Sequence, residues 1–99
     1  MKLVWSRRAL ADLTAIATYY STNAGPTIAR SIEDRFLVVL DRIRHAPESA
    51  PRVSQRSSVR VVAVVRYPFR IFYRVRGDAI DILHIRHTSR RPVVPTGLE

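Results

Sequence analysis

Apolar residues recur at spacings of three and four through the first half of the chain, a pattern that predicts two amphipathic helices. The first covers about residues 7–21 and has Ser6 as a suitable N-cap. The second covers about residues 26–45, with Pro26 in its first turn and Pro47 beyond its end. Because the break between them is short and each helix has one apolar stripe, we expect an antiparallel helical hairpin.

The pattern changes to strands after Ser58. Residues 46–58 contain two prolines and four serines and have the composition of a loop. Gly77–Asp78 suits a two-residue hairpin turn with glycine first. The predicted fold is α+β, in the order β-α-α-β-β-β, with the helical hairpin packed on one face of a small antiparallel sheet. Its strands are residues 2–5, 59–65, 69–76 and 79–87.

The predicted turn also fixes which residues of the last two strands face each other. Strict alternation from Gly77–Asp78 puts Arg74 opposite Asp81, a favourable pair of roughly 0.2–1 kcal/mol. It assigns one face to the core, with Phe69, Ile71, Tyr73, Val75, Ile80 and Ile82. It assigns the other face to Arg70, Phe72, Arg74, Arg76, Asp81, Leu83, Ile85 and His87.

The second face mixes large apolar residues with arginines, which is typical of a binding groove. Burial of Phe72, Leu83 and Ile85 would contribute about 1.5–3 kcal/mol each, so a fully solvated face would not usually carry all three. The alternative is that the C-terminal tail or the 46–58 loop folds over them.

Length and composition indicate one domain over residues 1–91, followed by a flexible tail at 92–99 whose end, Leu98–Glu99, resembles a cloning remnant. The absence of cysteine excludes disulfides and thiolate metal sites and suits the cytoplasm. We see no secretory signal, and no stretch approaches the roughly 18 apolar residues of a membrane span.

The charge is concentrated in the second half of the chain. The net charge is +9, and 16 of the 17 basic residues are arginine. Residues 52–91 hold ten arginines against two aspartates, a net +8, whereas residues 1–51 hold seven basic and five acidic residues, a net +2. Arginine binds carboxylates and phosphates well, so acidic proteins and nucleic acids are both plausible partners. A solvated basic surface is the alternative.

Several motifs of the second half occur together in one known family. Arg60 opens a strand, Tyr67–Pro68–Phe69–Arg70–Ile71 forms a turn and strand, Tyr73–Arg74–Val75 precedes the hairpin, and His87 is followed by Arg90–Arg91–Pro92. In order and spacing this resembles the RelE/ParE superfamily of toxins from type II toxin–antitoxin systems. The first half is similar too, although the loop after Pro47 lacks the glycine usual in the family.

The resemblance implies a toxin that is neutralised by a cognate acidic antitoxin, with a ParD-like protein expected. ParE-like members inhibit DNA gyrase and trap it with cut DNA, so direct nucleic-acid contact is possible through that complex. We expect antitoxin contacts at Arg70, Phe72, Arg74, Arg76, Leu83 and Ile85. We expect target contacts at Arg86, His87, Arg90 and Arg91, with a solvated basic end as the alternative.

Two other functions stay open. The RelE-like branch cleaves messenger RNA in the ribosome, and Arg70 and His87 would be its catalytic residues here. That set is incomplete, because no tyrosine follows His87 and the chain has no lysine beyond Lys2. The other alternative is a small basic nucleic-acid-binding module without a toxin role, in which arginines and aromatic rings bind single strands.

Metal and cofactor chemistry have little support in the sequence. His84 and His87 are three residues apart, so on one strand they point to opposite faces. We therefore expect no metal and no cofactor. We interpret His84 as a structural histidine at the edge of the core, and Tyr19 and Tyr20 as packing residues between the helices.

Overall fold

The fold is taken from a computed structural model that describes residues 1–88. The predicted tail at 92–99, and with it Arg90 and Arg91, lie outside the described residues. In chain order the elements are β1 (Lys2–Trp5), α1 (Arg7–Asn23), α2 (Pro26–His45), β2 (Arg52–Val53), β3 (Arg56–Val64), β4 (Phe69–Arg76) and β5 (Ala79–His87).

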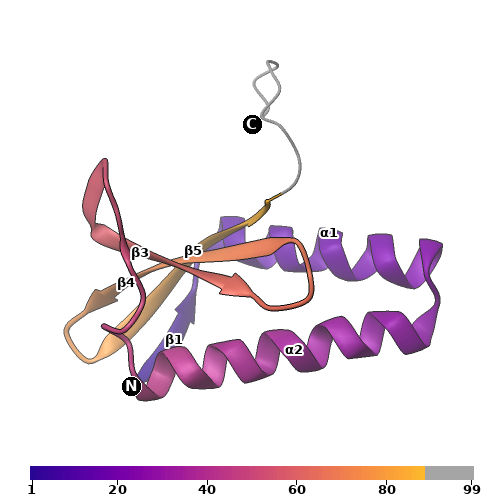
Figure 1. The fold of residues 1–99 in the computed structure, drawn as a ribbon, viewed down its shortest axis with the longest axis horizontal. Helices are drawn as coiled ribbons and strands as arrows, with labels where there is room; N and C mark the ends of the chain where they lie inside the picture. The colour runs from indigo at the N-terminus through magenta and orange to yellow at the C-terminus, as the bar shows by residue number, and fades with distance from the viewer. Residues whose placement is uncertain (89–99) are drawn as a thin grey trace.

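The two helices form an antiparallel hairpin that covers one face of a five-stranded sheet, as Figure 1 shows. This confirms the α+β architecture. The bounds predicted for α2 are correct, and α1 runs two residues further than predicted. The sheet face turned away from the helices, called the outer face below, has no helix of residues 1–88 packed on it.

Local sequence explains where both helices begin. Ser6 has extended backbone angles and its hydroxyl accepts a 2.9 Å hydrogen bond from the N–H of Ala9, which caps α1. Gly25 precedes α2 with φ +92°, a backbone conformation that is strained for any residue with a side chain. Pro26 then occupies the first turn of α2, where its missing N–H costs nothing.

The core lies between the helices and the inner face of the sheet. Its buried residues come from every layer: Ala9, Ile32, Phe36, Val39, Leu40, Ile43, Ala50, Val64, Phe69, Ile71, Tyr73, Ile80, Ile82 and Ile85. The Tyr73 hydroxyl donates a 2.7 Å hydrogen bond to the Pro47 carbonyl, and Arg60 donates one of 2.7 Å to the Ala50 carbonyl. These bonds tie the segment after α2 to the sheet.

The sheet is mixed, so the prediction of an antiparallel sheet was wrong in one pairing. The strand order is β1-β5-β4-β3-β2, and β1 runs parallel to β5 with Leu3 beside Ile80. Local patterns do not reveal this pairing, because the two strands are more than 70 residues apart in the chain. Residues 46–58 also contain more than a loop, since they include β2 and the start of β3.

The register of the final hairpin changes half-way along. From the turn to the pairs Arg74–Asp81 and Tyr73–Ile82 it is as predicted. It then shifts, so that Phe72 pairs with His84, and Leu83 is the extra residue of a β-bulge. Every side chain of β5 beyond the bulge therefore lies on the face opposite to the one predicted.

The bulge moves Ile85 from the outer face to the core. Ile85 pairs with Ile71 and is 4% exposed, so its predicted place in an outer-face groove was wrong. His87 moves with it and pairs with Phe69, a core residue. His84 and Arg86 move the other way, onto the outer face, which is why His84 does not lie at the edge of the core.

Candidate functional site

The outer face carries most of the arginines that the sequence singled out. Arg70, Phe72 and Arg74 of β4 lie there with Asp81, His84 and Arg86 of β5. Two of the predicted apolar groove residues, Phe72 and Leu83, are half-buried. The predicted groove is therefore narrower than expected, because Ile85 is not part of it.

One carboxylate organises the outer face near the hairpin turn. Asp81 is 7% exposed, and its two oxygens accept hydrogen bonds of 2.8 Å each from Nε and Nη2 of Arg76 and one of 3.1 Å from Nη2 of Arg74. The hydrogen bonds from Arg76, followed by those from Arg74, lower the pKa of Asp81 to about 2, against the opposing effect of burial. The predicted Arg74–Asp81 pair is confirmed, and Arg76 joins it.

Further along the hairpin, two arginines face each other without an acidic partner. Arg70 pairs with Arg86 across β4 and β5, and both side chains are exposed. No carboxylate of residues 1–88 lies within ion-pair distance of either. Like charges opposite each other destabilise a sheet. An anion bound between them would remove that repulsion.

An aromatic pair lies between the two groups of arginines. The rings of Phe72 and His84 are stacked with centroids 4.4 Å apart and an angle of 20° between their planes. Burial, and then the positive charges of Arg8 and Arg86, lower the pKa of His84 below its usual value of 6.5. The lowered pKa favours the neutral imidazole of His84, whose ring packs against Phe72.

The structure does not bring together the two residues proposed for RNA cleavage. Arg70 is on the outer face, whereas His87 is on the inner face beyond the bulge. His84 and His87 also lie on opposite faces, as their spacing predicts. Among residues 1–88 there is no group of three or more histidines and carboxylates that could hold a metal ion.

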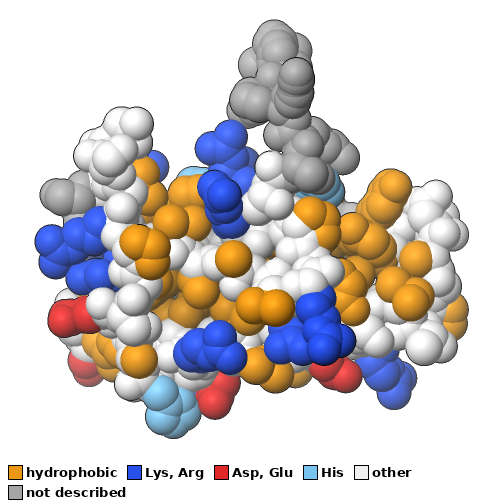
Figure 2. All heavy atoms as spheres, in the orientation of Figure 1, with side chains coloured by type: hydrophobic (Ala, Val, Ile, Leu, Met, Phe, Trp, Pro, Cys, Tyr) orange, Lys and Arg blue, Asp and Glu red, His pale blue; other side chains and the backbone are white. Residues whose placement is uncertain are grey.

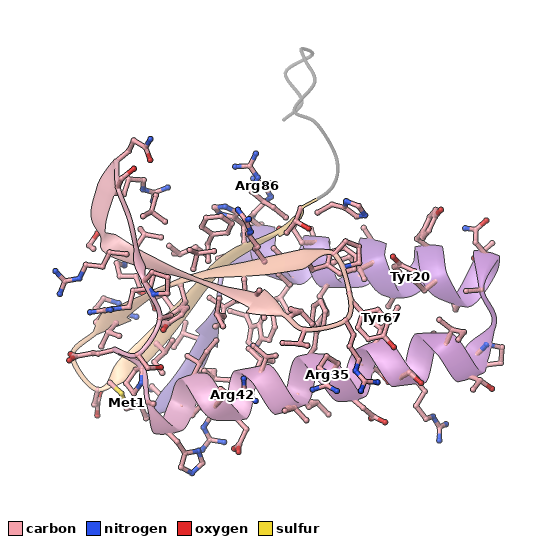
Figure 3. All side chains as sticks on the ribbon, viewed as in Figure 1. Met1, Tyr20, Arg35, Arg42, Tyr67 and Arg86 are labelled. Atoms are coloured by element: carbon pink, nitrogen blue, oxygen red, sulfur yellow. The ribbon has the colours of Figure 1, made fainter. Side chains whose placement is uncertain are left out.

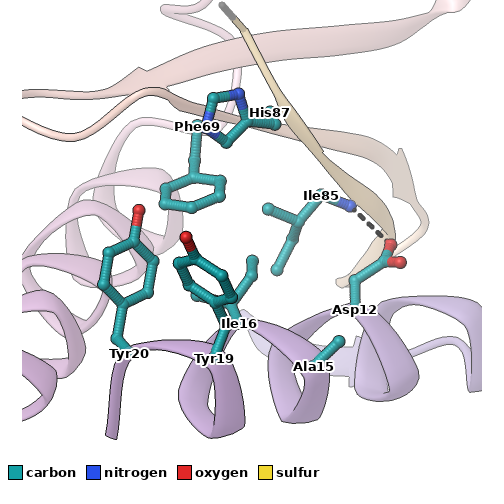
Figure 4. A pocket seen from close by; sticks show the side chains of 8 residues that line it. All are labelled: Asp12, Ala15, Ile16, Tyr19, Tyr20, Phe69, Ile85 and His87. Carbon is teal, nitrogen blue, oxygen red and sulfur yellow. Dashed lines mark hydrogen bonds between the residues drawn. The ribbon is translucent and has the colours of Figure 1, made fainter. Parts of the chain in front are cut away.

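A pocket of about 370 Å³ opens on the helix side of the sheet, between α1 and the ends of β4 and β5. Figure 4 shows its lining: Asp12, Ala15, Ile16, Tyr19, Tyr20, Phe69, Ile85 and His87. Two of these, Ile85 and His87, are residues that the sequence placed on the outer face. The sequence reasoning missed the pocket, because its β5 wall exists only once the bulge has turned these side chains inward.

Aromatic rings in edge-to-face contact line one side of this pocket. Tyr19 contacts Tyr20 with centroids 5.1 Å apart, Tyr20 contacts Phe69 at 6.1 Å, and Phe69 contacts His87 at 5.2 Å. Tyr19 is 59% exposed, so the prediction that it packs between the helices was wrong. Adjacent helical residues point about 100° apart, so only one of the two tyrosines can face the core, and it is Tyr20.

The first turns of α1 hold the bulged part of β5 in place. The Asp12 carboxylate accepts a 2.9 Å hydrogen bond from the backbone N–H of Ile85, the contact drawn as a dashed line in Figure 4, and a 3.2 Å bond from Arg8. The Ser6 hydroxyl donates a 2.7 Å bond to the Leu83 carbonyl. Beyond Trp5, the last residue of β1, the side chains of Asp12 and Ser6 therefore provide hydrogen-bond partners for the backbone of β5.

Comparison with known proteins identifies the family. The family model described as the ParE toxin of the type II toxin–antitoxin system parDE matches residues 3–92. The chain belongs to the ParE toxin family. No helix of residues 1–88 is long and apolar enough to span a membrane.

Individual relatives agree with this membership. Toxin RelE2 of Caulobacter vibrioides is 34% identical over 89 residues, which are 90% of this chain and 97% of that protein. A chain of the chromosomal ParDE system of P. aeruginosa has a TM-score of 0.76 and 33% identity, covering 88% of this chain and 95% of the other. The E. coli RelBE toxin–antitoxin complex gives a TM-score of 0.61 at 14% identity, covering 91% and 98%, and so shows the fold alone. This ParE-family chain is therefore a toxin of a type II toxin–antitoxin system.

Proposed function

We propose that this ParE-family toxin acts by binding DNA gyrase and is held inactive by an acidic antitoxin. The observation that carries the proposal is the separation of Arg70 and His87 onto opposite faces of the sheet. Metal-independent RNA cleavage needs a base, an acid and a cation around one phosphate. With His87 on the far side, Arg70 lacks the partner that a ribonuclease would use.

The other titratable groups of the outer face do not replace His87. His84 is on that face, but it is stacked on Phe72, and burial and nearby arginines favour its neutral form. Asp81 is held ionised by Arg76 and Arg74. A ribonuclease would need a second proton-transfer group beside His84. The family membership likewise favours a toxin over a basic nucleic-acid-binding module.

The charge of the molecule and its relatives both support an acidic antitoxin as its partner. The similar P. aeruginosa chain belongs to a ParDE system. The outer face offers Arg70 and Arg86 without acidic partners beside the half-buried Phe72 and Leu83. Carboxylates of a ParD-like antitoxin would pair with these arginines, with Arg74 and Arg76 at the other end of the hairpin. Such pairs speed association and weaken with salt.

The gyrase-contacting region is proposed at the end of β5. Arg86 projects there into solvent, where the described chain ends (Figure 3). His87 follows it, and Arg90 and Arg91 come next in the sequence. The guanidinium groups of these arginines suit the carboxylates of an enzyme and the phosphates of its bound DNA.

A supercoiling assay with purified gyrase and antitoxin-free toxin tests the proposal. We expect supercoiling to fall and cut DNA to accumulate as toxin is added, and Arg86→Ala to raise the inhibitory concentration at least fivefold. Arg30→Ala, which removes an exposed arginine from α2, is the matched control and should change nothing. Unimpaired supercoiling at a large excess of toxin would rule gyrase out as the target.

A further inference from the structure

We infer that the exposed face of α2 centred on Val38 binds the same face of a second toxin molecule, with the two helices side by side and pointing in the same direction. This surface, called the α2 face below, consists of Asp34, Arg35, Val38, Asp41 and Arg42. It shares no residue with the proposed gyrase contact or with the arginines of the outer face.

The α2 face carries its acidic and basic side chains in two separate columns. Each helical residue turns by 100°, and residues seven apart are displaced by only about 20° around the axis. Asp34 and Asp41 therefore lie on one flank of Val38. Arg35 and Arg42 lie on the other flank, and Figure 3 shows these two arginines on the same side of α2. Charged columns beside an apolar stripe set the partner and the orientation of paired helices.

Three of these four charged side chains have no ion-pair partner in their own molecule. The ion pairs within residues 1–88 include neither Asp34 nor Arg35 nor Arg42. Asp41 has only a 3.6 Å contact with His45, and both side chains are largely exposed. On a chain with a net charge of +9, an unpaired carboxylate such as Asp34 attracts the guanidinium group of another molecule.

Twofold symmetry decides how the two columns meet. In a twofold interface the same patch contacts itself, so that residue i meets residue j and j meets i. If the helices point in the same direction, the acidic column of each molecule faces the basic column of the other, and Asp34 meets the partner's Arg35. If they point in opposite directions, the two acidic columns face each other. The charges therefore favour the parallel arrangement, in which Val38 packs on its own copy.

The centre of the α2 face is apolar and adjoins a hollow. Val38 is 47% exposed, and basic and acidic side chains alternate with hydrophobic ones along the edge of the molecule formed by α2 (Figure 2). Beside Val38 a hollow of about 310 Å³ opens toward the turn after β3, and Arg66 of that turn lines it together with Asp34 and Arg35. The hollow thus holds two guanidinium groups and one carboxylate. The partner's acidic column offsets this excess of positive charge.

The acidic column disfavours the other possible occupants of the α2 face. An acidic antitoxin or a nucleic acid would be repelled by Asp34 and Asp41. A second copy of the chain carries a net +9, but residues 52–91 account for +8 of it. Helix α2 itself has four arginines and three acidic residues, a net +1. The basic outer face lies on the side of the sheet turned away from the helices, and salt screens charges beyond about 8 Å.

Oxidative cross-linking tests the contact directly, because the chain contains no cysteine of its own. We expect Val38→Cys and Ser31→Cys to form disulfide-linked dimers at least tenfold faster than Leu37→Cys. Ser31 lies seven residues before Val38 on the same stripe, so it meets its own copy only in the parallel arrangement. Leu37 is 63% exposed but is turned 100° away from Val38, so it is the matched control.

Charge reversal tests the two columns. Sedimentation of antitoxin-free toxin over a range of concentrations gives the Kd of the dimer, which is transient because so small an interface buries less than about 1,200 Å². Asp34→Arg should raise this Kd at least tenfold, and adding Arg35→Asp should restore it, since opposite charges then face each other again. Glu33→Arg makes the same change in net charge on another side of α2 and should alter the Kd little.

A toxin that stays monomeric at its highest soluble concentration overturns the inference. Cross-linking of Leu37→Cys as fast as that of Val38→Cys does so too, because random collision would then explain both. A tighter dimer with Asp34→Arg would mean that the helices point in opposite directions. If Val38→Asp leaves sedimentation unchanged but weakens antitoxin binding at least tenfold, the antitoxin covers this face and the inference fails. None of these outcomes depends on whether gyrase is the target.

Discussion

Arg70 and Arg86 face each other across β4 and β5, both exposed and neither paired with a carboxylate of residues 1–88. The bulge at Leu83 creates this pair, because it turns Arg86 outward while it turns Ile85 and His87 inward. One irregularity in β5 therefore both concentrates positive charge on the outer face and completes the pocket on the helix side.

Removing either arginine of this pair should slow antitoxin binding. For Arg70→Ala and Arg86→Ala we expect a lower association rate and a weaker dependence of that rate on salt, because fewer charges steer the encounter. The free toxin should be no less stable, since a like-charge repulsion of about 0.2–1 kcal/mol is relieved. Stopped-flow kinetics between 50 and 500 mM salt, about a threefold range in screening length, measure the effect. An equal effect of Arg30→Ala would mean that the whole net charge matters and not this pair.

Ile85 should behave as a core residue. Because it is 4% exposed and packs against the helices, Ile85→Ala should lower the free energy of unfolding by about 2–5 kcal/mol. Leu37→Ala, at a residue 63% exposed, should change it by less than about 0.5 kcal/mol. Denaturant unfolding measures both. A loss below about 1 kcal/mol for Ile85→Ala would contradict the bulged register.

The Asp81 cluster should make stability depend on pH in the acid range. The pKa of Asp81 falls from 3.8 in an unpaired side chain to about 2 in the folded protein, so its stabilisation is fully present above pH 4 and disappears as the pH falls through 2. At pH 7, Asp81→Asn should lower the free energy of unfolding by about 1–2 kcal/mol, since Arg74 and Arg76 are partly exposed.

The difference between the unaltered toxin and Asp81→Asn should shrink steadily as the pH is lowered from 4 to 2. Denaturant titrations at four or five pH values give the curve. Asp78→Asn, in the exposed hairpin turn, is the control and should show little difference at any of them. A difference independent of pH would exclude the ionised carboxylate as its source.

Ser6 should be important for stability, although it is a small residue near the chain start. Its hydroxyl both caps α1 and donates to the Leu83 carbonyl at the bulge. Ser6→Ala should cost about 1–2 kcal/mol, and Ser6→Thr should restore most of it. Thermal unfolding compares them with Ser31→Ala, whose hydroxyl bonds only to the preceding turn of α2 and should be neutral. Equal melting temperatures for Ser6→Ala and the unaltered toxin would contradict this role.

The sequence predicts the features that depend on neighbouring residues. Helical periodicity, Pro26 and the Gly77–Asp78 turn suffice for α1, α2 and the part of the hairpin next to the turn. Even the bulge has a local signal, because Ile82 and Leu83 are adjacent apolar residues that interrupt the alternation. Reading that interruption as a phase shift would have placed Ile85 in the core.

Other features depend on contacts between distant segments and could not be predicted. The parallel pairing of β1 with β5 and the hydrogen bond from Ile85 to Asp12 join the two ends of the chain. The pocket depends on both, because α1 must be held against β5 before Tyr19 and His87 can line one cavity. Alternation from the turn places Arg70, Arg74 and Arg76 on the outer face, but Arg70 meets Arg86 only in the shifted register.

We propose that this toxin acts by binding and does not cleave RNA. The most direct measurement maps messenger RNA ends in a translating cell-free extract given antitoxin-free toxin, with gyrase–DNA complexes scored in parallel. We predict intact messenger RNA together with gyrase trapped on cut DNA. Cleavage at ribosome-bound codons that disappears with Arg70→Ala, with gyrase unaffected, would mean that the toxin is a ribonuclease.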